Sequence, residues 1–182
     1  MPKAGPGTAV FAANLWIAGF VDDELRVAGS TYGPWEFWPG PLSEAGSPPA
    51  DCATYDQLWS LSRDTDLDFS AANTRLTQQV VDWPVDLGAP FVNVDGIEGY
   101  QPERGDYPAM NGDSQYWWVM NDRGNTHERF KTNPLGVEGR ASAFGFDTEN
   151  ELGNVTFYRY RIINKGPSII RDVQVGMHQD ID

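Results

Sequence analysis

The chain has 182 residues, of which 40% are hydrophobic and 13% aromatic, and its 26 acidic and 13 basic side chains give a net charge of −13 at pH 7. This composition excludes a disordered chain, because it supplies enough apolar surface for a core. The acidic charge argues against nucleic acid as a partner, since phosphates would be repelled, and no apolar run approaches the length of a transmembrane segment. Such a charge suits a secreted protein or a cation binder, and it also simply keeps a surface solvated.

The first part of the chain predicts a β-hairpin followed by a long loop. In residues 10–32 one face carries Leu15, Ile17, Gly19 and Val21, and the other carries Trp16, Ala18 and Phe20. Asp22-Asp23-Glu24 then turns the chain, and residues 25–28 return as the second strand. Residues 33–50 are rich in proline and glycine, so we expect an ordered loop that holds no strand ladder.

Two short helices are predicted next. Asp51 is placed to cap the first, whose apolar face would carry Tyr55, Leu58 and Trp59. Ser70 is placed to cap the second, which would end before Pro84 and present Ala72, Leu76, Val80 and Trp83. A short apolar run, residues 87–94, leads from there into an acidic loop.

The last third of the chain reads as β structure. Strand-like runs cover residues 116–120, 140–146, 155–163 and 169–177. The segment Asn164-Lys-Gly-Pro-Ser168 predicts a tight connection between the last two runs. Alternation along residues 155–163 indicates an antiparallel sheet with one face covered.

The acidic loop between residues 93 and 113 is the strongest candidate for a metal site. Its oxygen-bearing side chains alternate with glycines, as in loops that bind a hard cation such as Ca²⁺. The candidate ligands are Asn93, Asp95, Glu98, Gln101, Glu103 and Asp106. The same residues also fit a metal-free turn held by Asx-type hydrogen bonds, so the sequence leaves both readings open.

No catalytic constellation stands out. His127 and His178 lie far apart, no metal-ligand spacing or Gly-x-Ser-x-Gly motif occurs, and the many carboxylates form pairs by chance. Cys52 is the single cysteine, so it forms no disulfide within the chain. We expect it to be a small buried hydrophobe, and pairing with a cysteine elsewhere is the alternative.

Two tryptophans of the Pro-rich loop, Trp35 and Trp38, are candidate ligand-binding residues. Exposed indoles stack on sugar rings, whereas buried indoles anchor loops, and the sequence favours neither role for this pair. Trp117 and Trp118 lie within a predicted strand, and we expect them to pack in the core.

Several strings of residues resemble a known family. Asn14-Leu-Trp-Ile-Ala-Gly-Phe-Val, Glu36-Phe-Trp-Pro-Gly-Pro-Leu, Gln115-Tyr-Trp-Trp-Val-Met-Asn-Asp and Thr156-Phe-Tyr-Arg-Tyr-Arg-Ile-Ile-Asn-Lys-Gly occur in this order. They resemble the N-terminal region of large secreted Bacteroidetes-type surface proteins exported by the type IX secretion system. The resemblance implies a secreted or cell-surface location, and most members of that family have no assigned activity.

Residues 160–175 are also similar to the opening hairpin of immunoglobulin-like adhesion modules. Together, the two resemblances and the strand pattern imply a mainly β fold, an antiparallel sandwich of immunoglobulin-like or jelly-roll type, with long ordered loops and one or two short helices.

We expect residues 1–182 to form a single β-rich domain or a fragment of a larger one, because the chain stops directly after a strand pattern. Within it, residues 1–50 would form the hairpin and the Pro/Trp-rich loop, 51–92 the short helices, 93–113 the acidic loop and 114–182 the sheet region. The expected function is a non-enzymatic structural or adhesive module that contacts itself or other cell-surface proteins, in its sharpest form polymerising into filaments through an unpaired strand edge. The alternative is a carbohydrate-binding or carbohydrate-processing domain.

Overall fold

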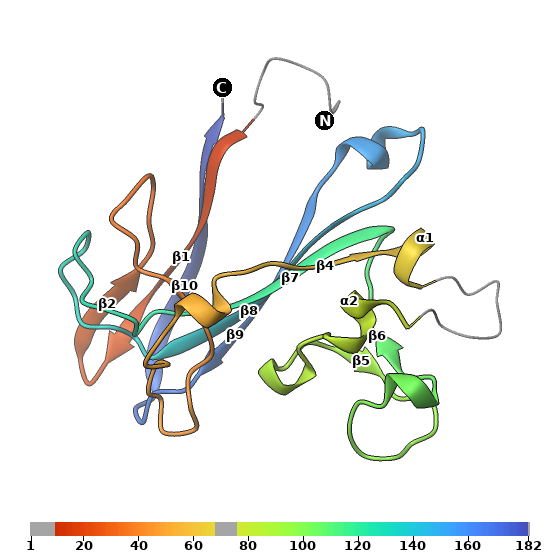
Figure 1. The fold of residues 1–182 in the computed structure, drawn as a ribbon. Coiled ribbons are helices and arrows are strands. Elements are labelled where there is room, and N and C mark those ends of the chain that lie inside the picture. The colour runs from red at the N-terminus through yellow and green to blue at the C-terminus, as the bar shows by residue number, and fades with distance from the viewer. Residues whose placement is uncertain (1–9, 68–75, 182) are drawn as a thin grey trace. The chain divides into compact units, whose positions relative to one another are not determined.

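The structure is a computed structural model that describes residues 10–67 and 76–181. It is mainly β, with antiparallel strands, as the sequence predicts (Figure 1). The chain divides into two compact units, each built from separated segments. Unit 1 comprises Met1–Gln57, Val119–Gly139 and Arg161–Asp182, and unit 2 comprises Leu58–Trp118 and Arg140–Tyr160.

The predicted N-terminal hairpin is present in unit 1. Strand β1 (Val10–Val21) pairs with β2 (Glu24–Ala28), and Val21 lies opposite Glu24. The two turn residues, Asp22 and Asp23, have φ angles of 52° and 63°. Two consecutive positive φ angles give a type I′ turn, which matches the twist of the flanking strands and tolerates aspartate. The hairpin prediction is therefore confirmed, including its turn.

Strand β10 (Ile170–Ile181) pairs with the other side of β1, which gives a three-stranded sheet in the order β10-β1-β2 (Figure 1). Leu15 lies opposite Met177 and Ile17 opposite Val175. The register shifts between Ala18 and Phe20 of β1, where β10 has one residue more, and Asp172 at this bulge has a φ of 51°. Among the described residues β10 pairs on one side alone, so it lies at an edge of this sheet.

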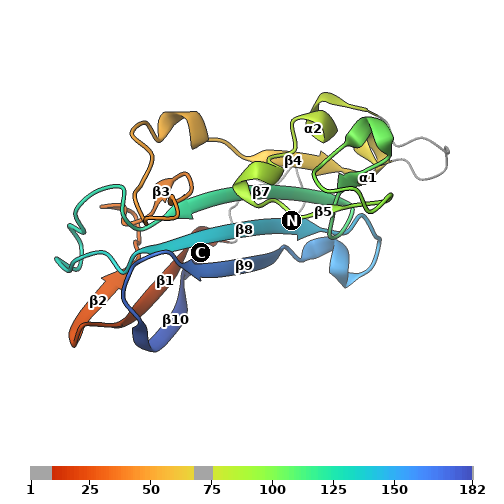
Figure 2. The ribbon, with the colours of Figure 1, turned by 90° about the horizontal axis from the view of Figure 1, so that it is seen from below.

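The remaining long strands form a second sheet in the order β3-β7-β8-β9, and β4 also pairs with β7 (Figure 2). Its members are β3 (Trp38–Pro39), β4 (Trp59–Ser62), β7 (Ser114–Asn121), β8 (Val137–Gly145) and β9 (Phe157–Asn164). The runs predicted from residue 114 onward are thus strands. The hairpin implied between β9 and β10 is wrong, because these two strands belong to different sheets.

The helical predictions fail in most details. In place of the first helix the chain has a single 3₁₀ turn, η1 (Ala53–Tyr55), followed by strand β4. The second helix is reduced to α2 (Gln78–Val81), capped by the Thr77 hydroxyl, and α1 (Arg63–Asp66) was not predicted. Ser70 and Ala72 lie outside the described residues. Cys52 is exposed at the start of η1, so the expected burial is wrong; a three-residue turn has no inner face to cover it.

Four further short elements of unit 2 lie before or within the acidic loop. They are η2 (Val85–Leu87), the two-stranded sheet of β5 (Phe91–Val92) and β6 (Tyr107–Pro108), and η3 (Pro102–Arg104). A last 3₁₀ turn, η4 (Glu151–Asn154), precedes β9.

Each unit has its own buried apolar residues. Those of unit 1 are Leu15, Ile17, Val21, Ala28, Leu42, Val119, Leu135 and Val137, and those of unit 2 are Leu61, Leu67, Val80, Trp83, Ala89, Trp117 and Ala141. In unit 2 the Trp117 ring contacts Trp59 edge-on at 5.6 Å and Trp83 at 6.3 Å between ring centroids. The predicted core role of Trp117 is confirmed, while Trp118 is half-buried. The sandwich arrangement of the sheets stays a prediction.

Candidate functional site

The acidic loop is closed by its own side chains. Asn93 accepts a hydrogen bond from the Gly96 N–H through Oδ1 and donates one to the Ile97 carbonyl through Nδ2. Asp95 Oδ1 accepts from the Ile97 N–H at 3.0 Å, and Asp95 Oδ2 forms an ion pair with Arg104 at 2.7 Å. The Ile97 N–H, together with Arg104, lowers the pKa of Asp95. These are the Asx-type turns that the sequence allowed as an alternative to calcium.

Asp106 holds the base of the same loop. Its side chain is fully buried, and its two oxygens accept from the N–H groups of Val94 and Gln101, both at 2.9 Å. The side-chain amide of Gln101 donates a hydrogen bond to the Glu98 carbonyl. Glu103 is exposed in η3. Asp106, a candidate metal ligand in the sequence, thus links the backbone of residues 94 and 101 through hydrogen bonds.

The donor set of this loop does not fit Ca²⁺. A calcium ion needs six to eight convergent oxygens, whereas the Arg104 cation already lies on the outer oxygen of Asp95 and backbone N–H groups occupy Asp106. Among the described residues no three His, Cys, Asp or Glu side chains are grouped closely enough to hold a metal ion. We therefore assign the loop a structural role.

The two candidate tryptophans differ in their surroundings. Trp35 has 60% of its surface exposed. Trp38 is half-buried in β3, where its ring lies 5.9 Å from that of His127 and packs against Gly124. Trp38 therefore anchors the loop, and Trp35 is the one of the two that a ligand can reach.

Buried carboxylates in unit 1 are a feature that the sequence analysis missed. Glu36 is fully buried and accepts from the N–H groups of Gly29, Arg129 and Phe130. Glu138 is also buried and accepts from the Leu42 N–H at 2.8 Å. A carboxylate buried in this way costs free energy unless its oxygens are satisfied, so these groups specify where the loops lie. The available signal was the position of Glu36 in an aromatic run, between Trp35 and Phe37.

Asp122 is the most heavily bonded member of this group. Its side chain is fully buried, with Oδ1 accepting from the Gly136 and Val137 N–H groups and Oδ2 from the Leu135 N–H, at 2.9, 2.8 and 2.5 Å. Burial raises the pKa of Asp122, and the three N–H donors and the charge of His127 act in the opposite direction. Asp122 thereby fixes the start of β8 to the end of β7.

His127 lies beside Asp122 and is fully buried. Its Nδ1 is 2.7 Å from the Val27 carbonyl oxygen and its Nε2 is 2.7 Å from the Asp122 carbonyl oxygen. Carbonyl oxygens only accept hydrogen bonds, so both ring nitrogens must donate, and only the imidazolium carries two N–H groups. The Asp122 carboxylate, 3.9 Å from Nε2, is its counter-charge. A ring engaged on both sides has no nitrogen left for acid–base catalysis.

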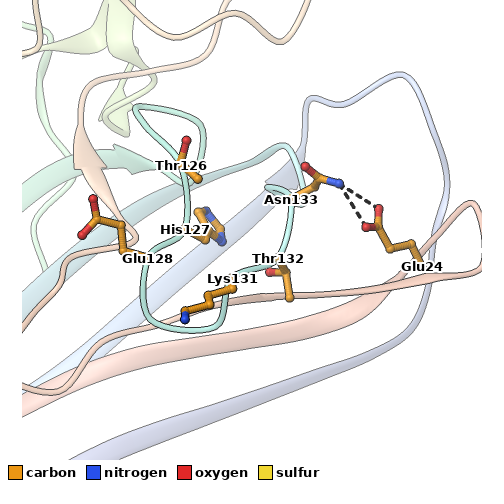
Figure 3. Close-up of a pocket in the computed structure, with 7 residues that line it drawn as sticks. All are labelled: Glu24, Thr126, His127, Glu128, Lys131, Thr132 and Asn133. Carbon is orange, nitrogen blue, oxygen red and sulfur yellow. Dashed lines mark hydrogen bonds between the residues drawn. The ribbon is translucent and has the colours of Figure 1, made fainter.

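A polar pocket of about 540 Å³ opens next to this histidine (Figure 3). It is lined by Glu24, Thr126, His127, Glu128, Lys131, Thr132 and Asn133. The Asn133 amide donates to both carboxylate oxygens of Glu24, and Glu24 also pairs with Arg26 at 3.1 Å. The pocket lies between the β1–β2 turn and the loop before β8, and the Asn133–Glu24 hydrogen bonds link these two segments.

The edge strand β10 presents an apolar row to solvent. Val173, Val175, Met177 and Ile181 are 46%, 56%, 44% and 69% exposed. They stand on the face of the sheet that carries Leu15 and Ile17, because residues directly opposite each other in paired strands share a face. Within residues 10–67 and 76–181, β10 pairs with β1 alone. In this part of the chain β10 is therefore an edge strand with a row of exposed apolar side chains.

Comparison of the chain with protein-family models, with curated proteins and with solved structures finds no match. In the described part of the chain no helix is long and apolar enough to span a membrane. The resemblance to secreted Bacteroidetes-type proteins stays a prediction.

Proposed function

We propose that this chain is a non-enzymatic structural or adhesive module, secreted or displayed at the cell surface, that associates with itself through the edge of its β10 sheet. The observation that carries the proposal is the exposed apolar row on β10, Val173, Val175, Met177 and Ile181, on a strand of twelve residues. Exposed edges of this length and character readily add a further strand, and proteins that avoid association usually shield them. The extracellular location rests on the resemblance described above.

The way in which the buried polar groups are used supports the non-enzymatic part of the proposal. Glu36, Asp106 and Asp122 accept hydrogen bonds from backbone N–H groups, and His127 is bonded on both sides. A catalytic acid or base must instead reach a substrate with a free atom. These groups make the loops rigid, which is what a module that transmits force or presents a surface requires.

The experiment that tests this proposal is negative-stain microscopy combined with light scattering on the purified chain at high concentration. Oligomers or ordered assemblies that dissociate on dilution are expected. A monodisperse monomer at the highest concentration reached would contradict self-association.

A second candidate function is carbohydrate binding at Trp35. The observation in its favour is that this exposed indole follows Pro34 and precedes Glu36, whose three backbone contacts hold the loop in place. A rigid, exposed indole is a suitable platform for a sugar ring. Glycan-array binding that Trp35→Ala abolishes would support this function, and equal binding by the wild type and Trp35→Ala would exclude it.

A further inference from the structure

We propose that the partner bound by β10 is a second copy of this chain, whose own β10 pairs antiparallel with the first about a twofold axis through Val175. This inference rests on the proposed function and adds to it the occupant and the register. It predicts a continuous six-stranded sheet in the order β2-β1-β10-β10-β1-β2, with three strands from each copy.

The twofold axis restricts which residues can face each other. An axis perpendicular to the sheet leaves every side chain on its original face, so residues on the exposed apolar face meet only residues of that face. In the regular part of β10, after the bulge at Asp172, this face carries residues 173, 175, 177, 179 and 181. The axis must therefore lie level with one residue of each strand, and not between two consecutive residues. Which residue this is depends on the side chains that each register brings together.

An axis at Val175 brings apolar side chains together. Val175 then faces Val175 of the other copy, and Val173 faces Met177 on either side of the axis. The exposed apolar side chains of both copies then contact one another across the two strands, which removes part of their surface from water.

Neighbouring registers are less favourable. An axis at Gly176 places two glycines on the axis and Val173 opposite the polar Gln179, so Val175 and Met177 form the remaining apolar pairs. An axis at Met177 places Val175 opposite the polar Gln179 and so interrupts the apolar patch. The Val175 register is the one of these three that places Val173, Val175 and Met177 all opposite apolar side chains.

The register also determines the size of the assembly. A twofold contact uses the same edge of both copies, so it closes after two chains and leaves no β10 edge open for a third. This interface therefore gives dimers rather than filaments.

Disulfide trapping tests the register directly. In a Cys52→Ser background, which removes the single native cysteine, Val175→Cys is oxidised with oxidised glutathione and the dimer is quantified on a non-reducing gel. Facing residues in an antiparallel pair have Cα atoms about 4.5–5.5 Å apart, within the range of a disulfide. We expect Val175→Cys to form a disulfide dimer at least about tenfold faster than Gln174→Cys, whose counterpart would be Gly176.

Mixed variants provide the control. Val173→Cys and Met177→Cys are each expected to stay largely uncrosslinked alone and to form a heterodimer when mixed. Self-crosslinking of Met177→Cys faster than that of Val175→Cys would overturn the register. Oligomers or filaments of the wild type without any of these crosslinks would overturn this inference, and of the proposed function they would leave self-association standing. A wild-type monomer without crosslinks would overturn both.

Discussion

Removing the Asp122 carboxylate is the perturbation whose size follows most directly from the structure. In Asp122→Ala the N–H groups of Leu135, Gly136 and Val137 lose their acceptor, and His127 loses its counter-charge. Each of these three N–H groups donates to the same fully buried carboxylate.

The expected cost is large compared with the total stability of a domain. A buried donor left without a partner costs about 1–3 kcal/mol, so three donors give roughly 3–9 kcal/mol if they simply add. Local relaxation and entry of water reduce this sum, and we expect a loss of at least about 3 kcal/mol. Domains are typically stable by only about 5–15 kcal/mol, so the variant should be close to unfolding.

The assay is urea unfolding followed by tryptophan fluorescence and circular dichroism. Asp56→Ala is the matched control in the same unit, because the Asp56 side chain is exposed and makes no described hydrogen bond; its effect should stay within about 0.5 kcal/mol. Asp122→Asn should fall between the two, since its amide oxygen can still accept from Gly136 and Val137 while its NH₂ group opposes the Leu135 N–H. A loss below about 1 kcal/mol in Asp122→Ala would refute the assigned role of the carboxylate.

Three further predictions concern the metal, pH and protonation of named residues. Because the acidic loop is closed by its own hydrogen bonds, the melting temperature in Ca²⁺ and in chelator should be the same. A calcium ion at 100 times its dissociation constant would add about 2.7 kcal/mol to the free energy of unfolding. Such a gain would contradict the structural role of Asp95 and Asp106. Burial and the nearby Asp106 raise the pKa of Tyr100. Above about pH 10 the unfolded chain ionises this phenol while the folded chain keeps it neutral. The contribution of Tyr100 to stability is therefore retained below about pH 10 and lost as the pH rises above that value. This alkaline loss, measured by urea midpoints, should be smaller in Tyr100→Phe, and an identical loss would count against the assignment. Because both ring nitrogens of His127 face carbonyl oxygens, nitrogen-15 NMR should show a proton on each, and a signal from an unprotonated ring nitrogen would contradict the imidazolium.

The sequence predicts those elements whose signals are local. The β1–β2 hairpin has its alternation and its turn residues, Asp22 and Asp23, within one short stretch. The β7 strand follows from a continuous run of aromatic and aliphatic residues, Tyr116 to Met120. Strand β4 was missed because Tyr55, Leu58 and Trp59 also have helical spacing. The segment is a strand because Trp59 pairs with Trp117, which is far away in the chain.

Long-range pairing explains the other errors. Asn164 to Ser168 contains a strong turn signal, yet β10 pairs with β1 because Leu15 and Ile17 must be placed beside Val175 and Met177. The buried role of Glu36 depends on N–H groups more than ninety residues away, at Arg129 and Phe130. An acidic residue in a sequence is normally read as exposed, and only the folded chain reveals which ones are satisfied inside.

The candidate sites also differ in how far local sequence determines their geometry. The turn geometry of Asn93 and Asp95 follows from their own neighbours, so the metal-free reading was accessible from the sequence. The difference between Trp35 and Trp38 depends on contacts with His127 and Gly124, which no local pattern reveals.

Sedimentation velocity of the wild type and two lysine variants tests the central claim most directly. Val175→Lys places two like charges face to face on the proposed axis, whereas Gln174→Lys adds the same charge one residue away on the opposite face of the strand. Both positions are exposed, so neither variant should unfold. The account predicts a concentration-dependent dimer for the wild type and Gln174→Lys, with association weakened about tenfold or more in Val175→Lys. Equal association of all three, or a monomer throughout, would contradict it.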